Sequence, residues 1–109
     1  MMAIKHNIRV SVQAPPGVPP FEFLSKRVNT KIYYCANIES SIIDNETTIL
    51  TLAKGYLHLI ISESVKQLFS NVEMLVVNKN VCVEGELFSY NDGFAIIIND
   101  PTQISLSGH

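Results

Sequence analysis

The sequence is poor in charged residues, in cysteine and in long hydrophobic runs, and it contains no tryptophan. Charged residues make up 17% of the chain against 47% hydrophobic residues, and the formal net charge is -2. This composition excludes an intrinsically disordered chain, which needs low hydrophobicity and a high net charge. It also excludes a strongly basic protein that binds nucleic acid mainly by neutralising phosphates.

No apolar stretch reaches the length of about 18 residues that a membrane span requires. The basic residues near the N-terminus are not followed by the apolar segment of a secretory signal. We therefore expect a soluble, cytoplasmic protein with no membrane partner. A chain of 109 residues has room for one domain with a real hydrophobic core.

Four of the five prolines lie in Pro15–Pro20, which excludes a helix or a central strand there. This segment predicts a stiff, extended linker. Ahead of it, Ile8, Val10 and Val12 alternate with other residues as in a short strand. The predicted organisation is an extended arm with a Pro-rich linker (1–20), a globular domain (21–106) and a tail (107–109). A strand beyond a stiff linker favours arm exchange in a homo-oligomer.

Alternating apolar and polar residues predict a β-rich domain. The predicted strands are residues 31–38, 47–53, 56–61, 81–89 and 94–98, with a polar loop at 40–46. The inward residues predicted for the second and third strands are Thr48, Leu50, Leu52, Leu57, Leu59 and Ile61. Lys54-Gly55 predicts a two-residue hairpin connection between those strands. Asn91-Asp92-Gly93 predicts a second hairpin turn, in which Asp-Gly supplies the positive φ.

One short helix separates the third and fourth predicted strands. Ser64 and Gln67 form a capping box at its start, and Val65, Leu68 and Phe69 lie on one helical face. Three strands, a helix and a two-stranded hairpin follow the element order of the OB-fold. We therefore predict a mainly β domain, a five-stranded OB-fold barrel with one short helix between strands 3 and 4.

A motif near the C-terminus points to a family. Val81–Gly93 holds a glycine within a strand and a tyrosine before a glycine turn, and Ile96–Ile104 continues with an aliphatic strand and Pro-x-Gln-Ile. This pattern resembles a bacterial OB-fold family of nucleic-acid-binding type, with similar domains in secreted nucleases, DNA-uptake proteins and small stand-alone proteins. The resemblance covers most of residues 21–106. Where that family usually has Lys and a polar residue after the turn glycine, this chain has Phe94-Ala95 and lacks the basic contact.

The motif residues are predicted to have structural roles. Gly85 permits a tight bend in its strand, and Gly93 closes the hairpin. Pro101 ends the strand pairing, and Gln103 hydrogen-bonds nearby backbone. The motif therefore explains the fold rather than the ligand.

Cys35 and Cys82 fall on the predicted first and fourth strands, which are neighbours in an OB-fold. A cross-strand disulfide is geometrically allowed, but two reduced, half-buried thiols are the favoured interpretation. The three histidines are scattered, and no cysteine or histidine pair has the spacing of metal ligands. We expect no metal and no cofactor.

If Tyr34 points into the core, polar and aromatic side chains point outward from the first three strands, which form the usual ligand platform of an OB-fold. The candidate nucleic-acid-binding residues are Lys31, Tyr33, Lys54, Tyr56, His58 and Tyr90. Their aromatic rings are suited to stacking on bases, and the lysines to contacting phosphate.

The same outward surface has a second interpretation. Ile49, Ile60 and Phe88 also point outward, and an exposed apolar patch usually marks an interface between proteins. Lys26-Arg27 and Lys31 form the densest basic cluster, but so few charges are more typical of a solvated face than of a phosphate site.

Catalysis has no support in the sequence. Glu84 and Glu86 share one face of a strand, which is typical of a solvated stripe rather than of an acid/base pair. No glycine-rich loop could cradle a phosphate, and we predict that the chain is not an enzyme. The leading hypothesis is a small stand-alone OB-fold protein that binds single-stranded DNA or RNA weakly, without sequence preference, by aromatic stacking. The alternative is a protein-interaction or oligomer-forming OB module that does not bind nucleic acid.

Overall fold

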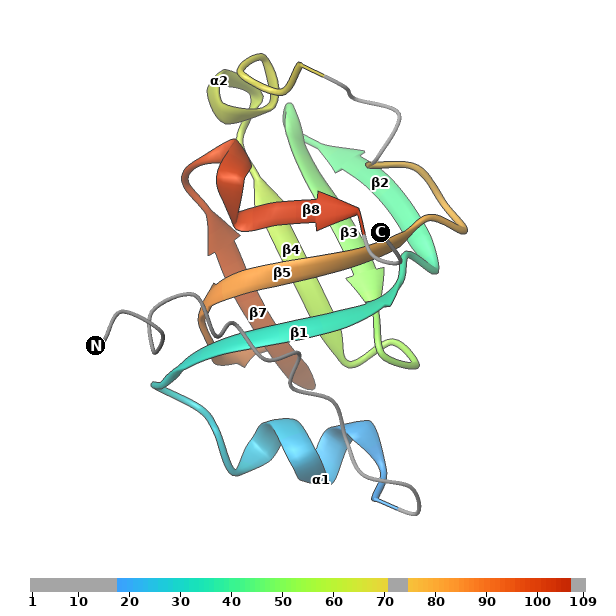
Figure 1. Ribbon diagram of the computed structural model, residues 1–109, viewed down its shortest axis with the longest axis vertical. Coiled ribbons are helices and arrows are strands. Elements are labelled where there is room, and N and C mark those ends of the chain that lie inside the picture. The colour runs from blue at the N-terminus through green and yellow to red at the C-terminus, as the bar shows by residue number, and fades with distance from the viewer. Residues whose placement is uncertain (1–17, 71–74, 107–109) are drawn as a thin grey trace, which may run out of the picture.

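The computed structural model describes residues 18–70 and 75–106 (Figure 1). These residues are mainly β, with eight strands in two sheets and two short α-helices. The elements are α1 (Pro20–Ser25), β1 (Lys31–Asn37), β2 (Ser40–Asp44), β3 (Thr47–Leu52), β4 (Leu57–Ile61), α2 (Glu63–Lys66), β5 (Asn80–Glu86), β6 (Phe88–Tyr90), β7 (Gly93–Ile98), the 3-10 turn η3 (Pro101–Gln103) and β8 (Ile104–Leu106). The three-stranded sheet has the order β1-β5-β8, and the five-stranded sheet has the order β2-β3-β4-β7-β6.

The chain passes from the three-stranded to the five-stranded sheet at two places, and one of them divides the strand predicted at residues 81–89. β1 continues into β2 across Ile38 and Glu39, and β5 continues into β6 across Leu87. β1 pairs antiparallel with β5, as predicted for the first and fourth strands, and β4 pairs parallel with β7. The hydrogen-bonded ladders form two separate sheets, which are not closed into a barrel. The five-stranded barrel is therefore not confirmed in that detail.

β2 lies within the segment predicted to be a polar loop at residues 40–46, so that prediction was wrong. All its side chains are exposed, so no alternation of apolar and polar residues marked it as a strand. β2 pairs with β3 through the turn Asn45-Glu46, whose residues have positive φ of 52° and 68°. Positive φ at both central residues matches the twist of paired strands, so this turn favours the hairpin.

The connection between β3 and β4 is longer than predicted. β3 ends at Leu52 and β4 begins at Leu57, and these two residues are direct partners in the ladder. Residues 53–56 therefore form a four-residue loop, in place of the predicted two-residue connection. Tyr56 belongs to this loop and not to the strand.

The hairpin of β6 and β7 is confirmed, but Asp92-Gly93 does not supply its positive φ as predicted. Tyr90 pairs with Gly93, and the positive φ of the turn lies at Asn91 (52°). Gly93 is needed for close approach, because a Cβ atom there would lie 2.6 Å from the carbonyl oxygen of Tyr56. The glycine thus lets the β3–β4 loop pack against the hairpin.

α2 lies between β4 and β5, where the sequence predicted the helix between strands 3 and 4. Its N-cap is Ser62, whose hydroxyl accepts a hydrogen bond from the Val65 backbone N–H at 3.4 Å, and not Ser64. Beyond the helix, Phe69 is buried but Leu68 is 65% exposed. The predicted apolar face is therefore only partly formed.

Cys35 and Cys82 form a disulfide, so the favoured prediction of two reduced thiols was wrong. The two residues are direct partners in the β1–β5 ladder, with their Cα atoms 3.9 Å apart. The sequence placed both on neighbouring strands, but the exact pairing register carried no local signal. Both cysteines are buried although they lie on the sheet face opposite Tyr34 and the core.

The hydrophobic core lies between the two sheets and extends from Phe23 to Ile104. Every residue predicted to point inward from β3 and β4 is buried, which confirms their alternation. The prediction of a single helix was wrong, because α1 is a second one and begins at Pro20, where a proline is tolerated since the first helical N–H needs no partner. α1 adds Phe23 and Leu24 to the core at the end of the molecule below β1 (Figure 1). Residues 1–17 of the predicted arm and the predicted tail (107–109) lie outside the described residues. Arm exchange therefore stays a prediction.

Gln103 hydrogen-bonds nearby backbone, as predicted. Its Oε1 accepts hydrogen bonds from the backbone N–H groups of Asn99 at 2.7 Å and Asp100 at 3.0 Å. Its Nε2 donates to the carbonyl oxygens of Glu84 at 2.9 Å and Ile97 at 3.3 Å. One side chain thus ties η3 to both β5 and β7, one strand from each sheet.

Candidate ligand-binding face

The outer face of the five-stranded sheet brings side chains from five strands into rows, because directly paired residues point to the same side. One row contains Ser40, Thr51, His58, Ala95 and Phe88. The next row contains Ile42, Ile49, Ile60 and Ile97. This face includes the outward residues that the sequence predicted for β3 and β4.

An aromatic patch is defined here as His58 and Tyr90, which lie on this face, together with Tyr56 on the loop that precedes β4. The rings of His58 and Tyr90 meet edge to face, with their centroids 5.3 Å apart. Tyr56 is 37% exposed, and its backbone oxygen accepts a hydrogen bond of 2.8 Å from the N–H of Phe94. Three of the predicted site residues therefore come from β4, its preceding loop and β6.

Phe21 of α1 extends the aromatic surface and was not predicted. Its ring centroid lies 5.1 Å from that of Tyr56 and 5.2 Å from that of Phe94. Phe21 is separated from both partners by long stretches of sequence, so no local pattern could reveal the contact.

The His58 side chain is half-buried and hydrogen-bonds to its neighbour across the ladder. Its Nδ1 lies 3.1 Å from the hydroxyl of Thr51. Burial lowers the pKa of His58 below its usual value, because the charged imidazolium loses solvation. At neutral pH the ring is therefore a neutral stacking surface and adds no positive charge to the face.

The isoleucine row, defined here as Ile42, Ile49, Ile60 and Ile97, crosses the middle of the same face. Its two ends are the most exposed, at 55% for Ile42 and 49% for Ile97. The sequence pointed to Ile49 and Ile60 but missed the ends. Ile42 lay in a presumed loop, and Ile97 belongs to a strand whose residues are nearly all apolar. Beside Ile97, an open hollow of about 380 Å³ is lined by Glu86, Phe88, Ile97, Asn99 and Gln103.

The five strands of this sheet contain no lysine or arginine, and their one formally charged residue at neutral pH is Asp44. Lys54 lies on the flanking β3–β4 loop, where its backbone N–H donates to the Glu39 carboxylate at 2.7 Å. The face is therefore aromatic and apolar, with little to attract phosphate.

Lys31 and Tyr33 lie on β1 in the three-stranded sheet, and not on the face that carries the aromatic patch. Lys31 Nζ lies 3.5 Å from a carboxylate oxygen of Glu84, and Tyr33 is the ladder partner of Glu84. The structure therefore divides the six predicted site residues between two surfaces.

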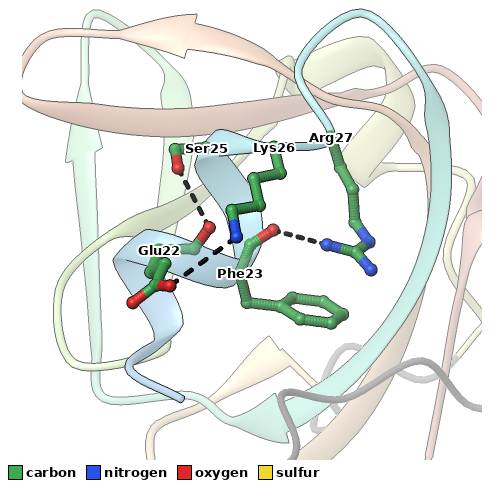
Figure 2. Close-up of polar contacts among 5 residues, drawn as sticks. All are labelled: Glu22, Phe23, Ser25, Lys26 and Arg27. Carbon is green, nitrogen blue, oxygen red and sulfur yellow. Dashed lines mark hydrogen bonds and ion pairs between the residues drawn. The ribbon is translucent and has the colours of Figure 1, made fainter.

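The predicted basic cluster is already engaged with other groups. Lys26 Nζ lies 3.6 Å from the Glu22 carboxylate (Figure 2). The Arg27 guanidinium stacks 3.8 Å from the Phe23 ring centroid and donates to the Phe23 carbonyl oxygen at 2.8 Å. With the Lys31–Glu84 pair included, all three cations of the cluster have contacts within the chain, and two of them are paired with a carboxylate.

In residues 18–70 and 75–106, no three His, Cys, Asp or Glu side chains gather where they could hold a metal ion. Within the same residues, no helix has the length and apolar character needed to cross a membrane.

Known structures share the fold at low sequence identity. The asparaginyl-tRNA synthetase from Pyrococcus horikoshii matches with a TM-score of 0.59 and 13% identity, over 79% of this chain and 21% of that one. The aspartyl-tRNA synthetase from Entamoeba histolytica matches with a TM-score of 0.54 and 14% identity, over 76% of this chain and 19% of that one. The chain therefore spans about a fifth of the length of these synthetases.

A third match is close to this chain in length. OBody AM1L10, in a structure bound to hen egg-white lysozyme, matches with a TM-score of 0.59 and 15% identity, over 92% of this chain and 99% of that one. At such identities the likeness shows the fold alone, and these neighbours have the OB-fold. No protein-family model matches the sequence, and no curated protein sequence matches it. The bacterial origin implied by the sequence motif stays a prediction.

Proposed function

We propose that the protein binds single-stranded nucleic acid weakly and without sequence preference, by stacking bases on the aromatic patch. The observation that carries the proposal is the contact between the rings of His58 and Tyr90 on the outer face of the five-stranded sheet, with the exposed Tyr56 on the loop that packs against Gly93. The fold shared with two tRNA synthetases, whose names state a tRNA substrate, supports the nucleic-acid assignment. Each stacked base contributes on the order of 1–3 kcal/mol. The proposed activity is binding without catalysis.

The electrostatics of the face predict how such binding responds to salt. The slope of affinity against salt concentration grows with the number of neutralised phosphates. Because the five strands carry no lysine or arginine, Lys54 on the flanking loop is the nearest predicted phosphate contact. The proposed complex therefore has a shallow salt dependence. Lys31 and Tyr33, on the other sheet, have no stacking role in it.

Fluorescence anisotropy of labelled single-stranded DNA and RNA oligomers tests the proposal. Tyr90→Ala removes one stacking ring and is expected to weaken binding roughly tenfold. Tyr33→Ala is the matched control, because it removes the same side chain from the three-stranded sheet and is expected to leave the affinity unchanged. An equal loss of affinity in both variants would contradict the assignment of binding to the aromatic patch. So would the absence of saturable binding by the unmodified protein at low salt.

A second candidate function is recognition of a protein partner through the isoleucine row. The exposed ends of that row and the absence of cations on the five strands favour an apolar partner over a phosphate backbone. The OBody of the same fold, which is bound to lysozyme, supports the idea that this architecture serves protein recognition. Binding of a protein partner that survives high salt and is lost in Ile60→Asp would favour this function.

The disulfide bears on where the protein acts. Disulfides persist in oxidising compartments and are rare in the reducing cytosol. The cytoplasmic location predicted from the sequence stays a prediction, and it requires Cys35 and Cys82 to be reduced there. Thiol labelling of the protein in its native cells distinguishes the two states.

A further inference from the structure

The edge of the five-stranded sheet at β2 is unusually open to another strand. β2 is the first strand in the sheet order and pairs with β3 on one side. In the described part of the chain, no strand pairs with its other side. All of its side chains are exposed, and Ile43 at 66% and Ile42 at 55% are among the most exposed large apolar residues there. The free edge therefore combines unpaired backbone groups with apolar side chains.

Proteins usually protect such an edge from pairing with other chains. Lysine, proline, a β-bulge or an inward-pointing charge are the common devices. The sequence of β2, Ser-Ser-Ile-Ile-Asp, has neither lysine nor proline, and its pairing with β3 is continuous from Ser40 to Asp44. Its single charge lies at one end. β2 therefore has the properties of a strand that pairs with another chain.

We infer that β2 pairs antiparallel with β2 of a second copy of this chain, so that two five-stranded sheets join into one. Two copies related by a two-fold axis through Ile42 would place this residue opposite itself. In that register Ser41 faces Ile43 of the second copy, and Ser40 faces Asp44 of the second copy. All residues of β2 are then paired, and the outer faces of both sheets remain on the same side.

Charge and symmetry favour a second copy over an unrelated strand. The register centred on Ile42 keeps the two Asp44 carboxylates at opposite ends of the interface, where like charges do not repel. A contact that uses the same surface on both copies also closes on itself and does not grow into a fibre. The isoleucine row of one copy would meet that of the other at Ile42 and form one continuous apolar stripe.

The dimer does not depend on the proposed nucleic-acid binding. The aromatic patch lies towards β6, at the other edge of the sheet order, so dimerisation leaves it accessible. A monomeric protein that binds oligonucleotides would overturn the dimer alone. A dimeric protein that binds no oligonucleotide would overturn the proposed function alone.

Sedimentation velocity of the full chain over a range of concentrations tests this inference. The unmodified chain is expected to be a dimer, and Ile42→Lys is expected to weaken dimerisation roughly tenfold or more by placing two like charges at the centre of the pairing. Ile97→Lys is the matched control, because it changes a similarly exposed member of the same row away from the β2 edge. A monomeric unmodified chain, or a dimer that withstands Ile42→Lys, would overturn the inference.

A cross-linking experiment tests the register. In an Ile42→Cys variant, mild oxidation is expected to yield a disulfide-linked dimer, since the two-fold axis places the new thiols opposite each other. An Ile97→Cys variant is expected to stay unlinked under the same conditions. Efficient linking of Ile97→Cys together with none for Ile42→Cys would show that another surface forms the dimer.

Discussion

The outer faces of the two sheets differ in how far their side chains are already engaged. On the three-stranded sheet, Cys35 and Cys82 are bonded to each other, and Lys31 pairs with Glu84. Gln103 hydrogen-bonds backbone groups beside it. On the five-stranded sheet, the aromatic patch and the isoleucine row are partly exposed. The first face holds the fold together, and the second offers surface to a ligand.

This difference shows that the outward phase of a strand does not by itself define a binding site. The sequence assigned outward residues of both sheets to one nucleic-acid-binding surface. Where an outward side chain has a covalent or ionic partner within the chain, it is less available to a ligand. The five-stranded sheet brings the two partly exposed rings of His58 and Tyr90 into contact, whereas Tyr33 on the three-stranded sheet lies beside Glu84.

The largest expected effect concerns the disulfide. Replacing Cys35 and Cys82 together by serine should lower the free energy of unfolding by about 4 kcal/mol, because the bond closes a loop with a sequence separation of 47 residues. Urea denaturation measures the change. A reducing agent should produce a similar loss in the unmodified protein, and equal stability of the oxidised and reduced forms would show that the bond does not hold this sheet.

The second effect concerns Gln103, which joins the two sheets. Gln103→Ala removes both the donor and the acceptor from hydrogen bonds to backbone, and should destabilise the protein by about 2–3 kcal/mol. Gln103→Glu keeps the acceptor towards Asn99 and Asp100 but loses the donor towards Glu84. A carboxylate oxygen then faces the carbonyl oxygens of Glu84 and Ile97, so Gln103→Glu should be no more stable than Gln103→Ala in urea denaturation. Full stability of either variant would contradict this role.

A smaller, stabilising effect is expected at Thr48. Its side chain is only 2% exposed, and its hydroxyl has no hydrogen-bond partner among the described residues. Thr48→Val removes the unpaired hydroxyl at nearly constant volume and should raise the free energy of unfolding by about 1 kcal/mol. Thr51→Val, in the same strand, should not stabilise, since the Thr51 hydroxyl lies 3.1 Å from His58 Nδ1. Thermal denaturation of both variants measures whether the gain in stability depends on the threonine hydroxyl having no hydrogen-bond partner.

The smallest expected effect is the pH dependence that His58 contributes. Because burial lowers its pKa in the folded protein, the unfolded chain binds more protons once the pH falls below its unfolded pKa of about 6.5. The contribution of His58 to folding stability should therefore decrease as the pH falls through that value towards the lower folded pKa. His58→Gln should flatten the stability profile in this range, and an unchanged profile would show that the ring is well solvated.

The sequence predicted the parts of the fold that leave a periodic pattern. Leu50 and Leu59 alternate with half-exposed residues on strands with one buried face, so their inward orientation was visible. The β-hairpin at Asn91 was visible from its turn residues. β2 gave no such signal because neither of its faces is buried. The bend at Leu87 that divides β5 from β6 was also invisible, since a local pattern does not report where a ladder changes partners.

The candidate site was harder to predict, because it depends on contacts between distant segments. Tyr56 and His58 were found from their outward phase, and Tyr90 from its place before a turn. The contact of Phe21 with Tyr56 depends on how α1 packs, which no local pattern encodes. The engagement of Lys31 by Glu84 depends on the β1–β5 register.

The measurement that tests the central claim most directly is mapping of backbone amide chemical shifts by NMR during titration with a single-stranded oligonucleotide. If bases stack on the aromatic patch, the shifts should concentrate on the outer face of the five-stranded sheet, around Thr51, His58 and Tyr90. Shifts concentrated instead around Tyr33 and Glu84 on the three-stranded sheet would contradict it.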